Sequence, residues 1–146
     1  MRYPAPLVQG SVIALTAFSA GVVEKYHPRL DRVIADFRQR GFTVVEGQCL
    51  RASHRQVSAD RALRAAELMA FLLDDSIDAV VPPWGGELAM ELLPLLDYDK
   101  IAAAKPKWIF GFSDVSTLCV ALSTKCAWAT AHCALRQLYA IKYCSS

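Results

Sequence analysis

The segment Ile77-Asp-Ala-Val-Val-Pro-Pro-Trp-Gly-Gly-Glu87 joins a short apolar run to a turn rich in proline and glycine. Residues 77–81 have the apolar, β-branched pattern of a strand that is buried on both faces. Residues 82–86 are predicted to form a turn, and residues 87–93 a helix. The segment therefore predicts one strand–turn–helix unit of an α/β sheet.

The alternation of strand and helix continues on both sides of this segment. Further strands are predicted at residues 11–15, 42–45, 108–110 and 128–131, and helices at residues 28–40, 58–73 and 113–122. Pro28 suits a first helical turn, Gly41 is the expected stop of that helix, and Ser58 is the expected N-cap of the next. The fold class predicted is α/β, with a mainly parallel open sheet and helices on both faces.

Size and composition limit the possible functions. The chain has 146 residues, which is typical of one domain, and 54% of them are hydrophobic, enough for a buried core. Its formal net charge is only +2, and no basic block is present, so nucleic acid is not an expected partner. No apolar run approaches the length of a membrane span, so a membrane is not an expected partner either.

The cysteines indicate a reducing compartment. Their number is odd and no pair forms Cys-x-x-Cys, which favours free thiols in a cytoplasmic protein; they are Cys49, Cys119, Cys126, Cys133 and Cys144. A zinc site built from Cys126, His132 and Cys133 has no standard ligand spacing, so neither a metal nor another cofactor is expected. The basic segment 47–57, with Arg51, His54 and Arg55, is interpreted as a solvated loop, although it could also rim a site for an anionic substrate.

Three loops follow the predicted strands and should meet at the carboxyl edge of the sheet, where open parallel sheets bind ligands. They are residues 16–21, 82–87 and 111–114. Ser113 lies between a strand and a helix, as a nucleophile does in a nucleophile elbow, although Val115 replaces the second glycine of that motif; Ser113 could equally be a simple N-cap. Gly86 could donate its amide to an oxyanion, or could merely belong to a tight turn.

Taken in order, these segments resemble the LD-carboxypeptidases and the related microcin C resistance serine peptidases. The resemblance covers residues 4–132 and is carried by Gly10-Ser-Val-Ile-Ala14, Phe18-Ser-Ala-Gly21, Pro82-Pro-Trp-Gly-Gly-Glu87 and Gly111-Phe-Ser-Asp-Val-Ser-Thr117. It implies a Rossmann-like or flavodoxin-like N-terminal domain, here residues 1–132, of an enzyme that cleaves an amide next to a C-terminal residue. The implied substrate is a small peptide, such as a murein peptide, or a peptidyl-nucleotide.

The resemblance also implies residue roles. Ser113 corresponds to the nucleophile, and the backbone amides of Gly86 and Asp114 correspond to the oxyanion donors. Gly85, Glu87 and Ser19 are expected to shape the substrate pocket. The family's histidine base and its glutamate partner come from a second domain that this sequence does not show.

The sequence departs from the family at its end. His132 is followed by Cys133-Ala134 where the family has Gly-Pro, and residues 133–146 match nothing in it, as in a truncated or frame-shifted chain. We therefore expect this chain to be inactive alone. We also expect a homodimer or other self-association, through apolar residues such as Trp128 and Tyr139 left exposed.

Two other interpretations remain open. A non-catalytic binding or regulatory module would keep the crevice without the chemistry. A glutamine-amidotransferase-like domain would need a nucleophilic cysteine at the elbow, where this chain has Ser113.

Overall fold

The computed structural model describes residues 1–53 and 55–133. Its single sheet has five strands in the order β2-β1-β3-β4-β5, and every pair is parallel. The strands are β1 (Val12–Leu15), β2 (Thr43–Glu46), β3 (Ala79–Val81), β4 (Trp108–Gly111) and β5 (Ala131–His132). The predicted α/β class and parallel sheet are confirmed.

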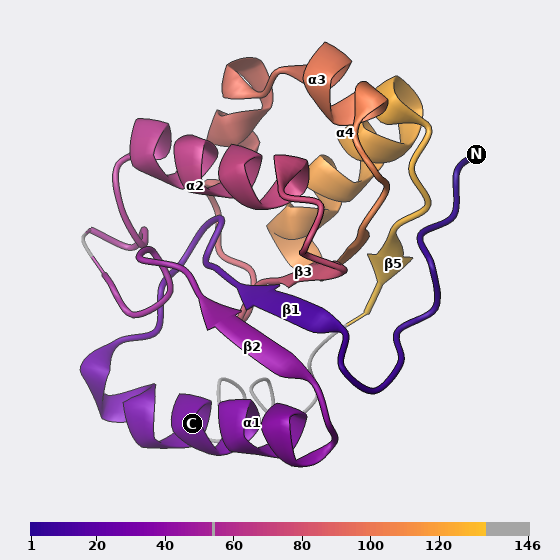
Figure 1. Cartoon of the computed structure of the whole chain (residues 1–146). Helices are drawn as coiled ribbons and strands as arrows, with labels where there is room; N and C mark the ends of the chain where they lie inside the picture. The colour runs from indigo at the N-terminus through magenta and orange to yellow at the C-terminus, as the bar shows by residue number, and fades with distance from the viewer. Residues whose placement is uncertain (54, 134–146) are drawn as a thin grey trace.

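Helices cover both faces of this sheet (Figure 1). Helix α1 (His27–Gln39) lies on one face, and α2 (Arg61–Leu73), α3 (Tyr98–Ala103) and α4 (Ser116–Cys126) lie on the other. Three 3₁₀ segments complete the described elements: η1 (Glu24–Tyr26), η2 (Ala89–Leu95) and η3 (Ser113–Val115). Among the residues described, no helix is both long enough and apolar enough to cross a bilayer.

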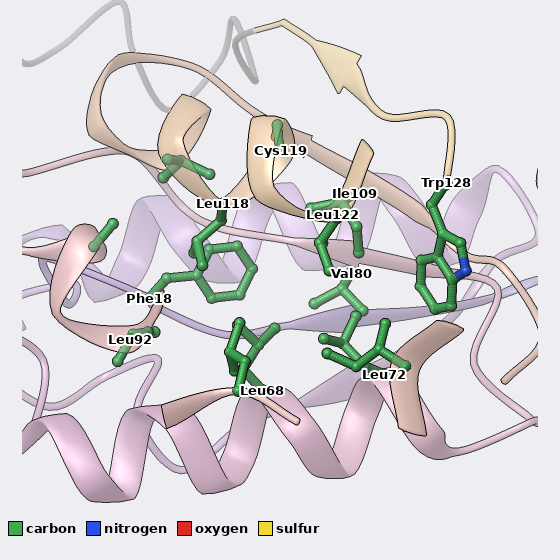
Figure 2. Packing of buried hydrophobic residues seen from close by; sticks show 14 of the residues in the cluster. Phe18, Leu68, Leu72, Val80, Leu92, Ile109, Leu118, Cys119, Leu122 and Trp128 are labelled. Carbon is green, nitrogen blue, oxygen red and sulfur yellow. The ribbon is translucent and has the colours of Figure 1, made fainter. Parts of the chain in front are cut away.

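Each face of the sheet has its own core. Under α1, an apolar stripe of the helix packs on β1 and β3: Leu30, Val33 and Ile34 are buried against Ile13 and Val81. Under α2 and α4, a larger cluster has Phe18 toward one end and Trp128 at the other (Figure 2). The two cores make β1 and β3 buried on both sides, which explains their uninterrupted apolar sequence.

Helix α1 begins and ends as expected, whereas α2 ends as expected at Leu73 but has a different N-cap. Pro28 lies in the first turn of α1, and Gly41 takes a φ of +90° just beyond its end. Ser58 is not the N-cap of α2, because its hydroxyl donates to the buried carbonyl of Ala17. Asp60 caps the helix instead, with its carboxylate accepting from Ala62 N at 3.3 Å.

One prediction in the middle of the chain is corrected, and one helix is added. The helix predicted at residues 87–93 is the 3₁₀ segment η2, which includes Pro94. The added helix is α3, where the Asp97 side chain accepts a hydrogen bond from Lys100 N and caps the helix. A proline is tolerated in 3₁₀ geometry and a carboxylate can cap a helix, so helical structure continues through this region.

The segments predicted to be exposed are partly buried. In the basic loop after β2, Cys49 and Leu50 are fully buried, and Arg51 forms ion pairs with Asp31 and Glu46. The expected strand at residues 128–131 is found at Ala131–His132, while Trp128 is 0% exposed. The prediction of an exposed Trp128 is therefore wrong, and Tyr139 and His54 lie outside the described residues.

Candidate active site

The loops after β1, β3 and β4 meet at the carboxyl edge of the sheet, as the sequence predicted. Trp84 Nε1 donates to the Ala20 carbonyl at 3.0 Å, which joins the β3 loop to the β1 loop. Gly86 N donates to the Asp114 carboxylate at 2.7 Å, which joins the β3 loop to the β4 loop. The order 2-1-3-4-5 places this edge beside the topological switch point between β1 and β3, where such folds bind ligands.

Ser113 occupies the sharp turn from β4 into η3. Its φ is +59°, a left-handed conformation that is uncommon for a residue with a Cβ, and the residue is exposed. The turn closes with Ser116 N donating to the carbonyls of Ser113 and Asp114. A strained, exposed serine between a strand and a helix has the backbone geometry of a nucleophile elbow.

Gly85 and Gly86 allow the β3 loop to approach its neighbours closely. A Cβ on Gly85 would lie 2.8 Å from Asp114 Oδ1 and 2.9 Å from Ser113 Cβ. A Cβ on Gly86 would overlap Ser19 Oγ and lie 3.1 Å from Ala20 N. Each glycine thus allows close contact with a different loop: Gly85 with the elbow and Gly86 with the loop after β1. Gly85 is itself buried.

The Asp114 side chain has a role that the sequence did not predict. Its two carboxylate oxygens accept from Gly86 N at 2.7 Å and from Ala89 N at 3.0 Å. The Gly86 amide, expected to be an open oxyanion donor, therefore already has a charged acceptor. An oxyanion at this place would have to share that N–H with the carboxylate.

Ser19 supports the turn from the other side. It is fully buried, and its Oγ accepts from Leu88 N at 3.2 Å. Because no surface of Ser19 is exposed, it does not line a substrate pocket as the sequence suggested. It fixes the chain just beyond Gly86 and Glu87.

A cavity of about 520 Å³ opens on the β1 side of the Gly85–Gly86 turn. Its lining includes Trp84, Tyr26, Lys25, Gly86 and the exposed Glu87. Tyr26 packs edge-on against Trp84 with ring centroids 5.9 Å apart, and Lys25 Nζ lies 4.8 Å from the centre of the Tyr26 ring. Glu87 and Gly86 thus border a space of small-molecule size.

Two charged residues of α2, Arg64 and Glu67, form hydrogen bonds with the loops around the site. Arg64, 2% exposed, donates to the carbonyls of Phe18, Leu88 and Ala59 and pairs with Glu91. The Glu67 carboxylate accepts from Thr16 Oγ1 after β1 and from Gln48 N and Cys49 N after β2. Burial, with the nearby Glu67 carboxylate, raises the pKa of the Cys49 thiol to about 12.

Arg64 could have been found from the sequence by its place on the helix. It precedes Leu68 by four residues and Leu72 by eight, so it lies on the buried face of α2. A charged residue on such a face needs buried partners, and loop carbonyls are the usual ones.

The described part of the chain supplies no evident general base for Ser113. His132 is exposed and lies beside Gly111 in the register of β4 and β5, and no hydrogen bond joins it to Ser113. His27 Nε2 lies 2.8 Å from the Val22 carbonyl, near the start of α1. Within residues 1–53 and 55–133, no group of three or more His, Cys, Asp or Glu side chains is placed to hold a metal ion.

Comparison with known proteins identifies the family of this chain. The family model of the LD-carboxypeptidase N-terminal domain matches residues 13–133. The chain belongs to this peptidase family. The matched region contains all the site residues discussed above, including Ser113, Asp114 and the Gly85–Gly86 turn.

Two relatives show the extent of the match. The microcin C7 self-immunity protein MccF of Escherichia coli is 31% identical over 121 residues, which are 83% of this chain and 35% of MccF. A candidate carboxypeptidase of Vibrio cholerae is 31% identical over 118 residues, which are 81% of this chain and 35% of that protein. The chain thus spans about a third of the length of these relatives.

Solved structures of MccF share the fold. The ligand-free MccF structure superposes with a TM-score of 0.81 at 30% identity, over 87% of this chain and 38% of that one. MccF has also been solved in complex with glutamyl sulfamoyl guanosine and with aspartyl sulfamoyl adenosine. The similarity extends across both faces of the sheet, because it covers most of the chain.

Proposed function

We propose that this domain carries the nucleophile of a serine carboxypeptidase, with Ser113 as that nucleophile. The observation that supports this most is the left-handed, exposed Ser113 at the carboxyl edge, packed against Gly85. A helix N-cap requires neither a positive φ nor a glycine turn at van der Waals distance. Family membership gives the same reaction class, a hydrolase of the serine peptidase type.

The reaction begins with attack of Ser113 Oγ on the carbonyl of an amide next to a C-terminal residue. The Oγ–carbon bond forms, the Oγ proton passes to a base, and the carbonyl oxygen becomes an oxyanion. The backbone N–H of Asp114, at the start of η3, and that of Gly86 are the proposed donors to this oxyanion. As the oxyanion collapses, the base gives its proton to the leaving nitrogen, the C–N bond breaks and the amine departs, and water then hydrolyses the acyl-enzyme.

The substrate we propose is a small peptide or a peptidyl-nucleotide. The sulfamoyl nucleosides bound by MccF carry an aminoacyl group on a nucleoside, which supports the second class. The cavity beside Gly86 is large enough for such a group and has Glu87 at its border. We place the reaction in the cytoplasm, where free cysteines such as the exposed Cys133 persist.

We propose that the base comes from outside the described residues. The relatives are about three times as long as the matched region, and the resemblance implies a histidine and a glutamate from a second domain. We therefore propose that the 146-residue chain alone hydrolyses no peptide. An unassisted serine hydroxyl is a weak nucleophile, and loss of the serine–histidine pair costs about 10⁶-fold in kcat in subtilisin.

Covalent labelling with a fluorophosphonate tests this function. The chain alone should label weakly, and the chain joined in cis to the C-terminal part of a family member should label at Ser113 and release a C-terminal residue. Ser113→Ala should abolish both, whereas Ser116→Ala, three residues further on, should preserve them. Strong turnover by the chain alone, lost in His132→Ala, would show that the base is His132.

A non-catalytic binding module is the second candidate. It is favoured by one observation: the Gly86 N–H, a donor that catalysis needs, is bound to Asp114. Binding of an aminoacyl nucleoside by the joined protein, with no labelling of Ser113 under any condition, would favour this candidate over the enzyme. We also propose that the chain self-associates, which light scattering would measure. Trp128 is buried and takes no part in such a contact.

A further inference from the structure

Both oxygens of the Asp114 carboxylate accept hydrogen bonds from backbone N–H groups of the loop after β3. Oδ1 accepts from Gly86 N at 2.7 Å, and Oδ2 accepts from Ala89 N at 3.0 Å. Ala89 is the first residue of η2, so the carboxylate also satisfies an N–H that this segment leaves without an internal partner. One side chain thus fixes both ends of the Gly86–Ala89 segment.

The contact between the two loops is tight. A Cβ on Gly85 would lie 2.8 Å from Asp114 Oδ1 and 2.9 Å from Ser113 Cβ, so the turn lies directly against the elbow. On its other side the turn is held by Ser19 Oγ, which accepts from Leu88 N. Asp114 is therefore the charged half of a two-sided support, and it is next to Ser113 in the chain.

We propose that the Asp114 side chain is a positioning residue that holds the Gly86 N–H in register with Ser113. This inference rests on the function proposed above, and it assigns to the side chain a role separate from that of the Asp114 backbone N–H. The carboxylate aligns the Gly85–Gly86 turn before the reaction. When the oxyanion forms, it shares the Gly86 N–H with the carboxylate. A carboxylate suits this role because its two oxygens accept from both N–H groups at once.

A side-chain amide in place of the carboxylate can accept from only one of the two backbone N–H groups, that of Gly86 or that of Ala89. In Asp114→Asn the side-chain oxygen accepts from Gly86 N or from Ala89 N, and its NH₂ group faces the other donor. In Asp114→Ala both backbone N–H groups lose the acceptor. The series aspartate, asparagine, alanine should therefore give a graded loss of order in the turn.

Amide proton shifts and residue-level hydrogen exchange, measured by NMR on the 146-residue chain, test the support directly. We expect the protection of Gly86 and Ala89 to fall about tenfold or more in Asp114→Ala. In Asp114→Asn one of the two amides should keep its wild-type shift and protection. Asp97→Asn is the matched control, because Asp97 caps a backbone N–H on α3, and it should change Lys100 and leave Gly86 unchanged.

The reactivity arm uses the chain joined to a family C-terminal part. Fluorophosphonate labelling of Ser113 should be slower in Asp114→Ala than in the wild type, intermediate in Asp114→Asn, and unchanged in Asp97→Asn. Wild-type amide shifts and protection in Asp114→Ala would overturn the proposal, as would exchange that rises uniformly along the chain in Asp114→Asn. Faster labelling in Asp114→Ala would also overturn it, by showing that the carboxylate competes with the oxyanion.

The two proposals fail in different ways. If no variant labels, wild type included, the proposed function fails, and the amide measurement alone decides whether Asp114 positions the turn. If wild type and Asp114→Ala label equally while both amides lose protection, the support exists but the reaction does not use it, and the positioning role is wrong.

Discussion

The guanidinium of Arg64 forms an ion pair with Glu91 at 2.5 Å, with the Arg64 side chain 1% exposed and that of Glu91 35% exposed. The same guanidinium donates to the carbonyls of Phe18 and Leu88, in the loops after β1 and β3. Arg64 therefore ties helix α2 to both loops that support Gly86. A buried charge in this position stabilises the fold only while all its partners are present.

Arg64→Ala should lower the free energy of unfolding by about 3–5 kcal/mol, because it leaves loop carbonyls and Glu91 without their donor. Chemical denaturation followed by circular dichroism measures this change. Arg61→Ala, at an exposed position in the same helix, should stay within about 0.5 kcal/mol of the wild type. Equal losses in the two variants would contradict the role of Arg64.

Gly86→Ala should destabilise the fold by about 1–3 kcal/mol, because the added Cβ overlaps Ser19 Oγ in a closed space. Ser19→Ala removes that oxygen, so the double variant should lose less stability than the two single losses added together. Thermal unfolding of the wild type, the two single variants and the double variant measures this coupling as a double-mutant cycle. Strict additivity would show that Gly86 and Ser19 do not touch.

Asp78 gives the stability a dependence on pH. Burial alone would raise the pKa of its carboxyl, but hydrogen bonds from Val12 N and Lys105 outweigh burial and hold the pKa below its usual value. A lowered folded-state pKa stabilises the protein above the unfolded value of about 3.9, and this contribution is lost as the pH falls through the folded value.

Asp78→Asn should therefore cost about 1 kcal/mol or more at pH 7, and the difference from the wild type should shrink below about pH 4. Urea denaturation at a series of pH values measures it. The exposed Asp75→Asn is the control and should show little change at either pH. If the stability difference between the wild type and Asp78→Asn grew as the pH fell, the lowered pKa of Asp78 would be contradicted.

The cysteines should differ sharply in reactivity. Burial raises the pKa of the Cys119 and Cys126 thiols, and the pKa of Cys49 is about 12, so at pH 8 only about one Cys49 in 10⁴ is ionised. Iodoacetamide should modify the exposed Cys133 in the native protein and spare the three buried residues until denaturant is added. Peptide mass mapping reads this out, and rapid native modification of Cys49 would contradict its burial.

The sequence determined the order of the strands, the helices α1, α2 and α4, and the place of the elbow, but not the helix α3. Continuous apolar runs and helical stripes are local patterns, and the parallel connection rules convert them into a sheet whose carboxyl edge gathers residues 16–21, 82–87 and 111–114. The family resemblance added the candidate roles of Ser113, Gly86 and Asp114.

Only the tertiary structure decided which polar atoms bind one another across that edge. Ser19 was expected in the pocket and is a buried support, Asp60 rather than Ser58 caps α2, and Trp128 is enclosed rather than exposed. The Asp114 carboxylate reaches Gly86 and Ala89, 28 and 25 residues away along the chain. No local pattern contains such contacts, because a buried donor takes the acceptor that packing brings to it, and packing depends on the whole chain.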